Sequence, residues 1–275
     1  MHLHAEARDA LSIQSDQPDP ITEGDPNPGR PTTEVHPIDR LMDRASLALA
    51  ETRYFDAAND AAHALNRARR DNDFERMARI CLPLQEARRQ IRQVATDAVS
   101  QRGTVQVVSH PGDLRGPLQP GCYLIQPPMI GADARVLRET AVKRRIPIAV
   151  LAREPLTRKG LWPLVGVGEV SIRVQVDPPR PLERRDDHIT KDGYEGPVSL
   201  AWFESAGEAL GDKAIADLDP DLHPHWRVDE MMEALDAYPE HEKLHQALAA
   251  ACRDAIGVPD PVGRRPSPLD NPFSF

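Results

Sequence analysis

The chain has 275 residues, a formal net charge of −9 and only 4% aromatic residues. This length can form one large domain or two small ones with a sizeable core, and the negative charge argues against general binding to nucleic acid or to anionic membranes. The cysteines Cys81, Cys122 and Cys252 are odd in number and widely spaced, so we expect neither a disulfide framework nor a cysteine-based zinc site. No apolar run approaches a membrane span and no signal peptide is apparent, so we expect a cytoplasmic protein.

Both ends of the chain are rich in proline. Residues 1–37 carry six prolines and a net charge of −5, and residues 258–275 carry five prolines. Such segments bury too little apolar surface to offset the conformational entropy lost on ordering. We therefore expect both tails to be disordered.

Residues 38–102 show an almost continuous helical pattern. Apolar and small residues recur every three or four positions in three successive runs, which predicts two helices and a third, longer one. Pro83 lies inside the third run, and its missing N–H predicts a kink or a split near Leu82. We therefore expect an N-terminal helical hairpin followed by a long kinked helix.

Part of this region has the spacing of a known helical repeat. Within residues 38–72 the sequence reads Tyr54-Phe55-x-x-Ala58-x-x-x-Ala62-x-x-Leu65, which resembles a tetratricopeptide-type helical hairpin over about one repeat. No second copy follows at the expected spacing of roughly 34 residues. The resemblance implies a scaffold that binds a partner protein, and an ordinary helical hairpin is the alternative.

Residues 103–178 change to a strand period. Strands are predicted at 104–109, 122–126, 146–151 and 165–176, with a helix at 132–145 between the second and third. This order is a βαβ unit, in which the two strands run parallel. The fold class is therefore mixed α and β (α+β), with a small sheet of about four strands covered by helices.

The rest of the chain returns to helices. Residues 179–199 are interpreted as a linker or mobile loop, and helices at 200–218, 224–237 and 240–255 form a C-terminal helical region of residues 200–257. Residues 103–176 have a net charge of +5, whereas residues 200–256 have −9. We expect the acidic helices to dock on the basic α/β unit, within one chain or between chains.

The sharpest motif is His241-Glu242-Lys243-Leu244-His245, which matches the zincin pattern HExxH. On a helix, His241 and His245 lie on one side, where they could bind zinc while Glu242 acts as a general base. No third ligand follows at the zincin spacing, and acidic residues at a helix start are favoured by the helix dipole. We therefore disfavour His241 and His245 as a metal pair and expect no cofactor.

A second candidate is the loop from Pro127 to Asp133, between a strand and a helix N-terminus. Ligands often bind at this position in α/β proteins, and Met129, Gly131 and Asp133 are its candidate ligand-binding residues. The loop has no glycine-rich phosphate motif, and Asp133 suits a helix N-cap better than a phosphate contact.

No catalytic residue is predicted. These features favour a non-enzymatic protein-interaction or scaffold protein that uses its helical surface to bind another protein or itself, without nucleic acid or membrane. The alternative is a small-molecule-binding or metal-dependent hydrolytic enzyme that uses the loop at 127–133 or the His241/His245 pair.

Overall fold

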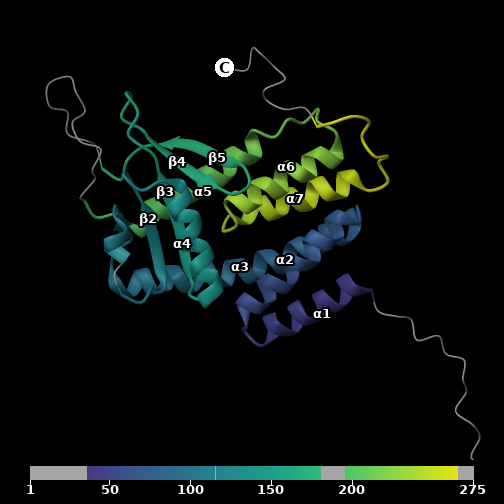
Figure 1. Cartoon of the computed structure of the whole chain (residues 1–275), viewed down its shortest axis with the longest axis horizontal. Helices are drawn as coiled ribbons and strands as arrows, with labels where there is room; N and C mark the ends of the chain where they lie inside the picture. Colours follow the sequence, from purple (N-terminus) through teal and green to yellow (C-terminus); the bar gives the residue numbers. More distant parts are fainter. Residues whose placement is uncertain (1–35, 115, 181–195, 266–275) are drawn as a thin grey trace, which may run out of the picture. The chain divides into compact units, whose positions relative to one another are not determined.

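The computed structural model describes residues 36–114, 116–180 and 196–265, which all belong to one compact unit. Within these ranges, seven α-helices and a five-stranded sheet form a mixed α and β fold (Figure 1), as the sequence predicts. The disorder expected for residues 1–37 and 258–275, and the linker expected at 179–199, fall mostly outside the described residues. None of the described helices is both long and apolar enough to cross a membrane.

Three helices open the described part of the chain: α1 (Pro37–Ala50), α2 (Tyr54–Arg70) and α3 (Phe74–Arg102). Asp73 caps α3 by accepting the backbone N–H of Arg76, and the left-handed Gly103 ends it. α2 packs against both α1 and α3. Its contact faces consist largely of alanine, whose small side chain lets helices approach closely: Ala57, Ala61, Ala64 and Ala68 are all buried.

The long helix α3 runs without interruption through Pro83, so the chain is not split near Leu82. Pro83 removes one backbone hydrogen bond from the helix. The buried residues on either side, Cys81 and Leu84, pack into the main core. This packing holds both halves of the helix in place, which sequence propensity alone does not capture.

The sheet has the strand order β1-β2-β3-β4-β5. Its strands are β1 (Gln106–Val108), β2 (Gly121–Ile125), β3 (Ile148–Arg153), β4 (Trp162–Val167) and β5 (Ser171–Val176), and a short 3-10 helix, η1 (Pro111–Leu114), follows β1. β1, β2 and β3 are parallel, and α4 (Gly131–Arg144) connects β2 to β3, which confirms the predicted βαβ unit. β4 and β5 are antiparallel additions at one edge.

The single strand expected at 165–176 is instead part of a hairpin. The Gly168 N–H donates to the Val170 carbonyl at 2.8 Å and closes the turn between β4 and β5. A side chain at Gly168 would collide with Asp236 and with the backbone of Ala237, at the end of α6 (Pro224–Ala237). The alternating pattern continues on both sides of this turn, so it did not reveal the fifth strand.

Helices cover both faces of the sheet. On one face, residues of β2 and β3 such as Tyr123, Ile125 and Val150 pack with α4. On the other face, the alternate residues Cys122 and Leu124 join the main core, which includes α3 and the C-terminal helices. Because both faces are buried, the central strands are apolar throughout.

The acidic C-terminal helices pack on the rest of the chain. α5 (Leu200–Ala216) lies against β4 and β5, while α7 (Glu242–Ala255) lies against α3 and α6. The Trp202 ring meets the buried Trp162 ring edge-on, with 5.5 Å between centroids. This packing agrees with the expected docking. However, the acidic helices also form ion pairs with α2 and α3, outside the basic α/β unit, such as Arg92–Glu242 at 2.7 Å.

Two leucines of α3 provide a test of this core. Leu84 is 1% exposed and Leu82 is 70% exposed. Replacing Leu84 by alanine leaves a cavity and should lower the free energy of unfolding by about 2–5 kcal/mol, whereas Leu82→Ala should change it by less than about 0.5 kcal/mol. Urea unfolding of both variants measures the difference. Equal losses would contradict the assignment of Leu84 to the core.

Candidate functional site

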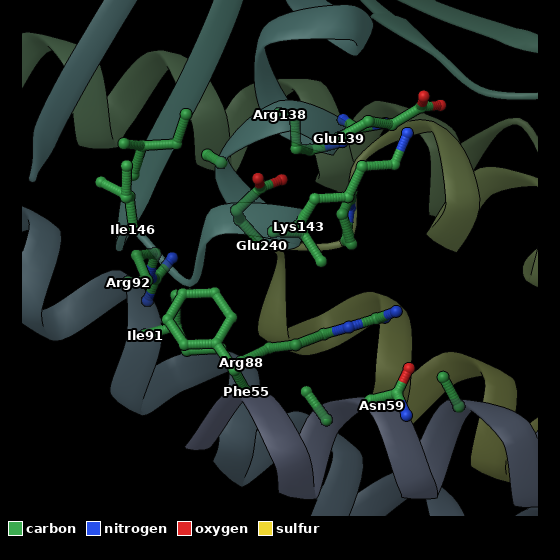
Figure 2. A pocket seen from close by; sticks show the side chains of 16 residues that line it. Phe55, Asn59, Arg88, Ile91, Arg92, Arg138, Glu139, Lys143, Ile146 and Glu240 are labelled. Carbon is green, nitrogen blue, oxygen red and sulfur yellow. The ribbon is translucent and has the colours of Figure 1, made fainter. Parts of the chain in front are cut away.

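A cavity of about 350 Å³ lies where α2, α3, α4 and the turn before α7 meet (Figure 2). Most of its wall is apolar and comes from α2, α3 and the region of α4 that leads into β3: Phe55, Ala58, Ala62, Ile91, Val142 and Ile146. Ala58 and Ala62 lie one turn apart on the same face of α2. Their short side chains leave space that larger residues would fill.

Six charged side chains also line this cavity, and three of them have partners that account for their position. Arg92 donates to Glu242 Oε1 at 2.7 Å, and Glu139 accepts from Arg135 at 2.9 Å. Arg138 donates to the backbone carbonyls of Val167, Asp236 and Ala237 at 3.0–3.2 Å. Arg138 therefore ties α4 to β4 and to the end of α6.

Two of the remaining groups, Arg88 and Glu240, lack a charged partner among the residues that the structure describes. In the described part of the chain no carboxylate oxygen lies within 4.0 Å of the Arg88 guanidinium, whose one hydrogen bond to a side chain is with the neutral His245. The Glu240 Oε2 atom is buried and has no hydrogen-bond partner. Both residues are densely surrounded by protein and keep some accessible surface, since they line the cavity.

Burial shifts the pKa values of both groups toward their neutral forms. It lowers the pKa of Arg88 to about 10, with a smaller opposing effect from Glu240. It raises the pKa of the Glu240 carboxyl above its usual value, while Arg138 and other nearby arginines act in the opposite direction. Keeping either group charged here without a paired ion is costly. The sixth charged residue, Lys143, is exposed, so its ammonium group can remain hydrated.

The residues of the HExxH motif have separate roles in the structure. α7 begins at Glu242, so His241 is its N-cap, and its Nδ1 accepts the backbone N–H of Leu244 at 3.2 Å. His245 Nδ1 donates to the His241 carbonyl at 3.0 Å, and its Nε2 accepts from Arg88 at 3.2 Å. Both ring nitrogens of the buried His245 are therefore bound to protein, and Glu242 is paired with Arg92.

The other nitrogen of His241 faces two carboxylates. His241 Nε2 lies 3.3 Å from an oxygen of Glu208 and of Asp212, without hydrogen-bond geometry to either. These three side chains are close enough to suggest a metal site. However, Lys243 Nζ lies 2.8 Å from Asp212, and the cap bond at Nδ1 places the proton of neutral His241 on Nε2. This arrangement needs no metal to account for its charges.

The predicted loop residues have structural contacts. Met129 belongs to the core between the sheet and α4. Gly131 is the first residue of α4, and a side chain there would collide with Val165 and Val167 of β4. Asp133 is the third residue of α4 rather than its N-cap, and its Oδ2 accepts the backbone N–H of the N-cap residue Ile130 at 2.8 Å. The structure brings these residues together at the start of α4, at the opposite end of this helix from the cavity.

A polar cluster that was not predicted links the carboxyl ends of the parallel strands. Gln126 donates to Ser109 Oγ at 2.7 Å and accepts from Arg153 at 2.9 Å. Arg153 is 1% exposed, and its guanidinium lies 4.4 Å from the centroid of the Trp162 ring. Ser109 and Gln126 directly follow apolar strands, and Arg153 ends one. Polar residues at the ends of apolar strands can be recognised in the sequence.

The cysteines are poorly suited to nucleophilic chemistry. Cys81, Cys122 and Cys252 are all buried and form no disulfide. Burial raises the pKa of Cys81 and of Cys122 to about 12, and raises that of Cys252 as well. The reactive thiolate is therefore strongly disfavoured at neutral pH.

Comparisons with protein-family models, with curated proteins and with solved structures found no match to this chain. The resemblance of residues 38–72 to a tetratricopeptide-type hairpin therefore rests on its own spacing. These residues form α1, α2 and the turns around them.

We expect far less than one zinc ion per chain in protein purified without added metal, since both ring nitrogens of His245 bind protein groups. Elemental analysis measures this content. Stoichiometric zinc that disappears in His245→Ala would contradict the expectation, and the exposed His63 supplies a control in His63→Ala.

His245 should also make stability depend on pH. Burial lowers its pKa to about 3, with a further contribution from Arg88, so folded His245 stays neutral near pH 5. The unfolded chain binds a proton at this histidine as the pH falls through roughly 6.5, so the stabilisation present at higher pH is lost, by about 1–2 kcal/mol between pH 7 and pH 5.

His245→Gln keeps one donor and one acceptor but does not titrate, so its unfolding free energy should fall less over this range than that of the wild type. The exposed His63→Gln should behave like the wild type. Urea unfolding at both pH values compares the three proteins. If the unfolding free energy of His245→Gln falls as much as that of the wild type, His245 is not the source of the pH dependence.

Proposed function

We propose that this protein is a non-enzymatic binding protein and that the cavity between α2, α3, α4 and the turn before α7 holds its ligand. The observation that carries this proposal is a pair of oppositely charged groups on the cavity wall, Arg88 and Glu240, without charged partners in the described residues. Unpaired buried charges are costly to stability. Residues kept at such a cost are often functional.

The size and lining of the cavity support this proposal. Its volume of about 350 Å³ lies at the lower end of the range for small-molecule sites. An apolar wall with a few polar groups is the usual composition of such sites. The wall is shared by the N-terminal helices and by α4. A ligand bound here would therefore contact two parts of the fold.

The buried thiols and His245 favour a non-enzymatic role. The thiols are buried with raised pKa values, and His245 would have to break two hydrogen bonds to act as a base or a metal ligand. We therefore do not propose hydrolysis at the His241/His245 pair. The loop at 127–133 is likewise secondary, because Gly131 and Asp133 serve the packing and capping of α4.

Binding of another protein, or of a second copy, through the helical surface remains the second candidate. The observation that favours it is the exposure of two large apolar side chains on the N-terminal helices, Leu47 of α1 and Leu82 of α3. Large apolar residues are more often buried than exposed, so these two are side chains that a bound partner would cover.

A dye assay tests the cavity as a binding site. Anilinonaphthalene sulfonate has an apolar ring system and one negative charge, so it should bind the folded wild type saturably and gain fluorescence. Ala62→Phe fills the cavity and should weaken dye binding by about tenfold or more, a loss of roughly 1.4 kcal/mol.

Ala250→Phe makes the same change on the exposed side of α7 and is the matched control. It should leave dye affinity within about twofold, a small free-energy change. Circular dichroism and thermal melting show whether both variants keep the fold. A folded Ala62→Phe that binds dye as tightly as the wild type would rule out this cavity as the site.

A further inference from the structure

The hydrogen-bonding capacity of Arg88 and Glu240 is largely unused. A guanidinium has five N–H donors, and Arg88 uses Nη1 to donate to His245. Glu240 Oε2 accepts no hydrogen bond despite being buried. In Figure 2 the Glu240 carboxylate lies between the α4 residues Arg138 and Lys143 on one side and the Arg88 and Phe55 side chains on the other. Arg88 therefore offers hydrogen-bond donors to the cavity, and Glu240 offers an acceptor.

These two groups do not satisfy each other. They are more than 4.0 Å apart, since they form no ion pair, yet Arg88 is among the charges that affect the pKa of Glu240. A bound molecule that carried both an acceptor and a donor could lie between the two groups and bond to each. A carboxylate suits the guanidinium through paired N–H···O bonds, and an ammonium group suits the carboxylate.

The rest of the wall defines the third feature of the ligand. Phe55, Ile91 and Val142 present apolar surface to the same cavity. Of the other cations, Arg138 is occupied by three carbonyls, and Lys143 is exposed. They therefore do not require a second negative charge on the ligand.

We propose that the cavity binds an α-amino acid with an apolar side chain. Its carboxylate pairs with Arg88, its ammonium group donates to Glu240, and its side chain packs on Phe55, Ile91 and Val142. This inference rests on the proposed function, because it names the ligand class of the same cavity. Leucine and phenylalanine are small enough for a site of about 350 Å³.

Isothermal titration calorimetry of the full chain with phenylalanine and leucine tests the proposal. We expect binding to weaken by about tenfold or more in Arg88→Gln and in Glu240→Gln, because each variant removes one charged hydrogen bond. The controls Lys159→Gln and Glu75→Gln remove exposed charges of the same two signs that do not line the cavity. They should change the affinity by less than about threefold.

Ligand analogues separate the two charged contacts. Phenylpropanoate lacks the ammonium group, so it should bind the wild type about tenfold more weakly than phenylalanine does, and Glu240→Gln should weaken it no further. Phenethylamine lacks the carboxylate and should be insensitive to Arg88→Gln. Phenylpropanoate binding as tight as that of phenylalanine would overturn the role of Glu240 and, with it, the amino-acid assignment.

The outcomes also distinguish this inference from the proposed function. Dye binding that Ala62→Phe abolishes, together with no binding of phenylalanine or leucine, would overturn the amino-acid proposal and leave the cavity as a binding site. Amino-acid binding that persists in a folded Ala62→Phe would overturn both. Circular dichroism of every variant ensures that a loss of binding is not a loss of folding.

Discussion

Burial of α3 on several sides is the constraint on which the rest of the structure depends. This helix packs against α1 and α2, against α5 and α7, and against strands β2 and β3. Its buried residues, from Phe74 to Val99, extend along nearly its whole length. Apolar burial contributes about 25 cal/mol per Å², so a helix covered on several sides can tolerate Pro83 in its interior. The helical hairpin, the sheet and the acidic helices share one core because they share this helix.

Charged residues of α3 bond to side chains of the surrounding helices. Arg76 bonds to Asp39 of α1, and Arg92 bonds to Glu242 of α7. Such partly exposed pairs contribute little each, roughly 0–1 kcal/mol, but they favour one arrangement of the helices over others. Arg88, on the same helix, differs from these two, since its side-chain partner is a neutral histidine. It lines the cavity that we propose as the ligand site.

Prediction from the sequence worked where the signal was local and failed where it was not. The period of the apolar residues located the helices and the βαβ unit, and Pro224 and Ala237 bound α6 as predicted. The hairpin turn at Gly168 was missed, since the turn depends on contact with Asp236 far along the chain. For the same reason, the sequence could not show that Arg88 and Glu240 line one cavity. His241 and His245 match the spacing of a zinc-binding motif. In the structure, His241 caps a helix and His245 bonds to Arg88.

The three buried thiols lie on elements that are far apart in sequence: Cys81 in α3, Cys122 in β2 and Cys252 in α7. All three belong to the main core, so an alkylating reagent can reach each sulfur only when that part of the core opens. The three native cysteines can thus report local opening of the core without an engineered label. Equal alkylation rates at the three sites would identify one cooperative opening of the helices and the sheet, and unequal rates would show which layer separates first.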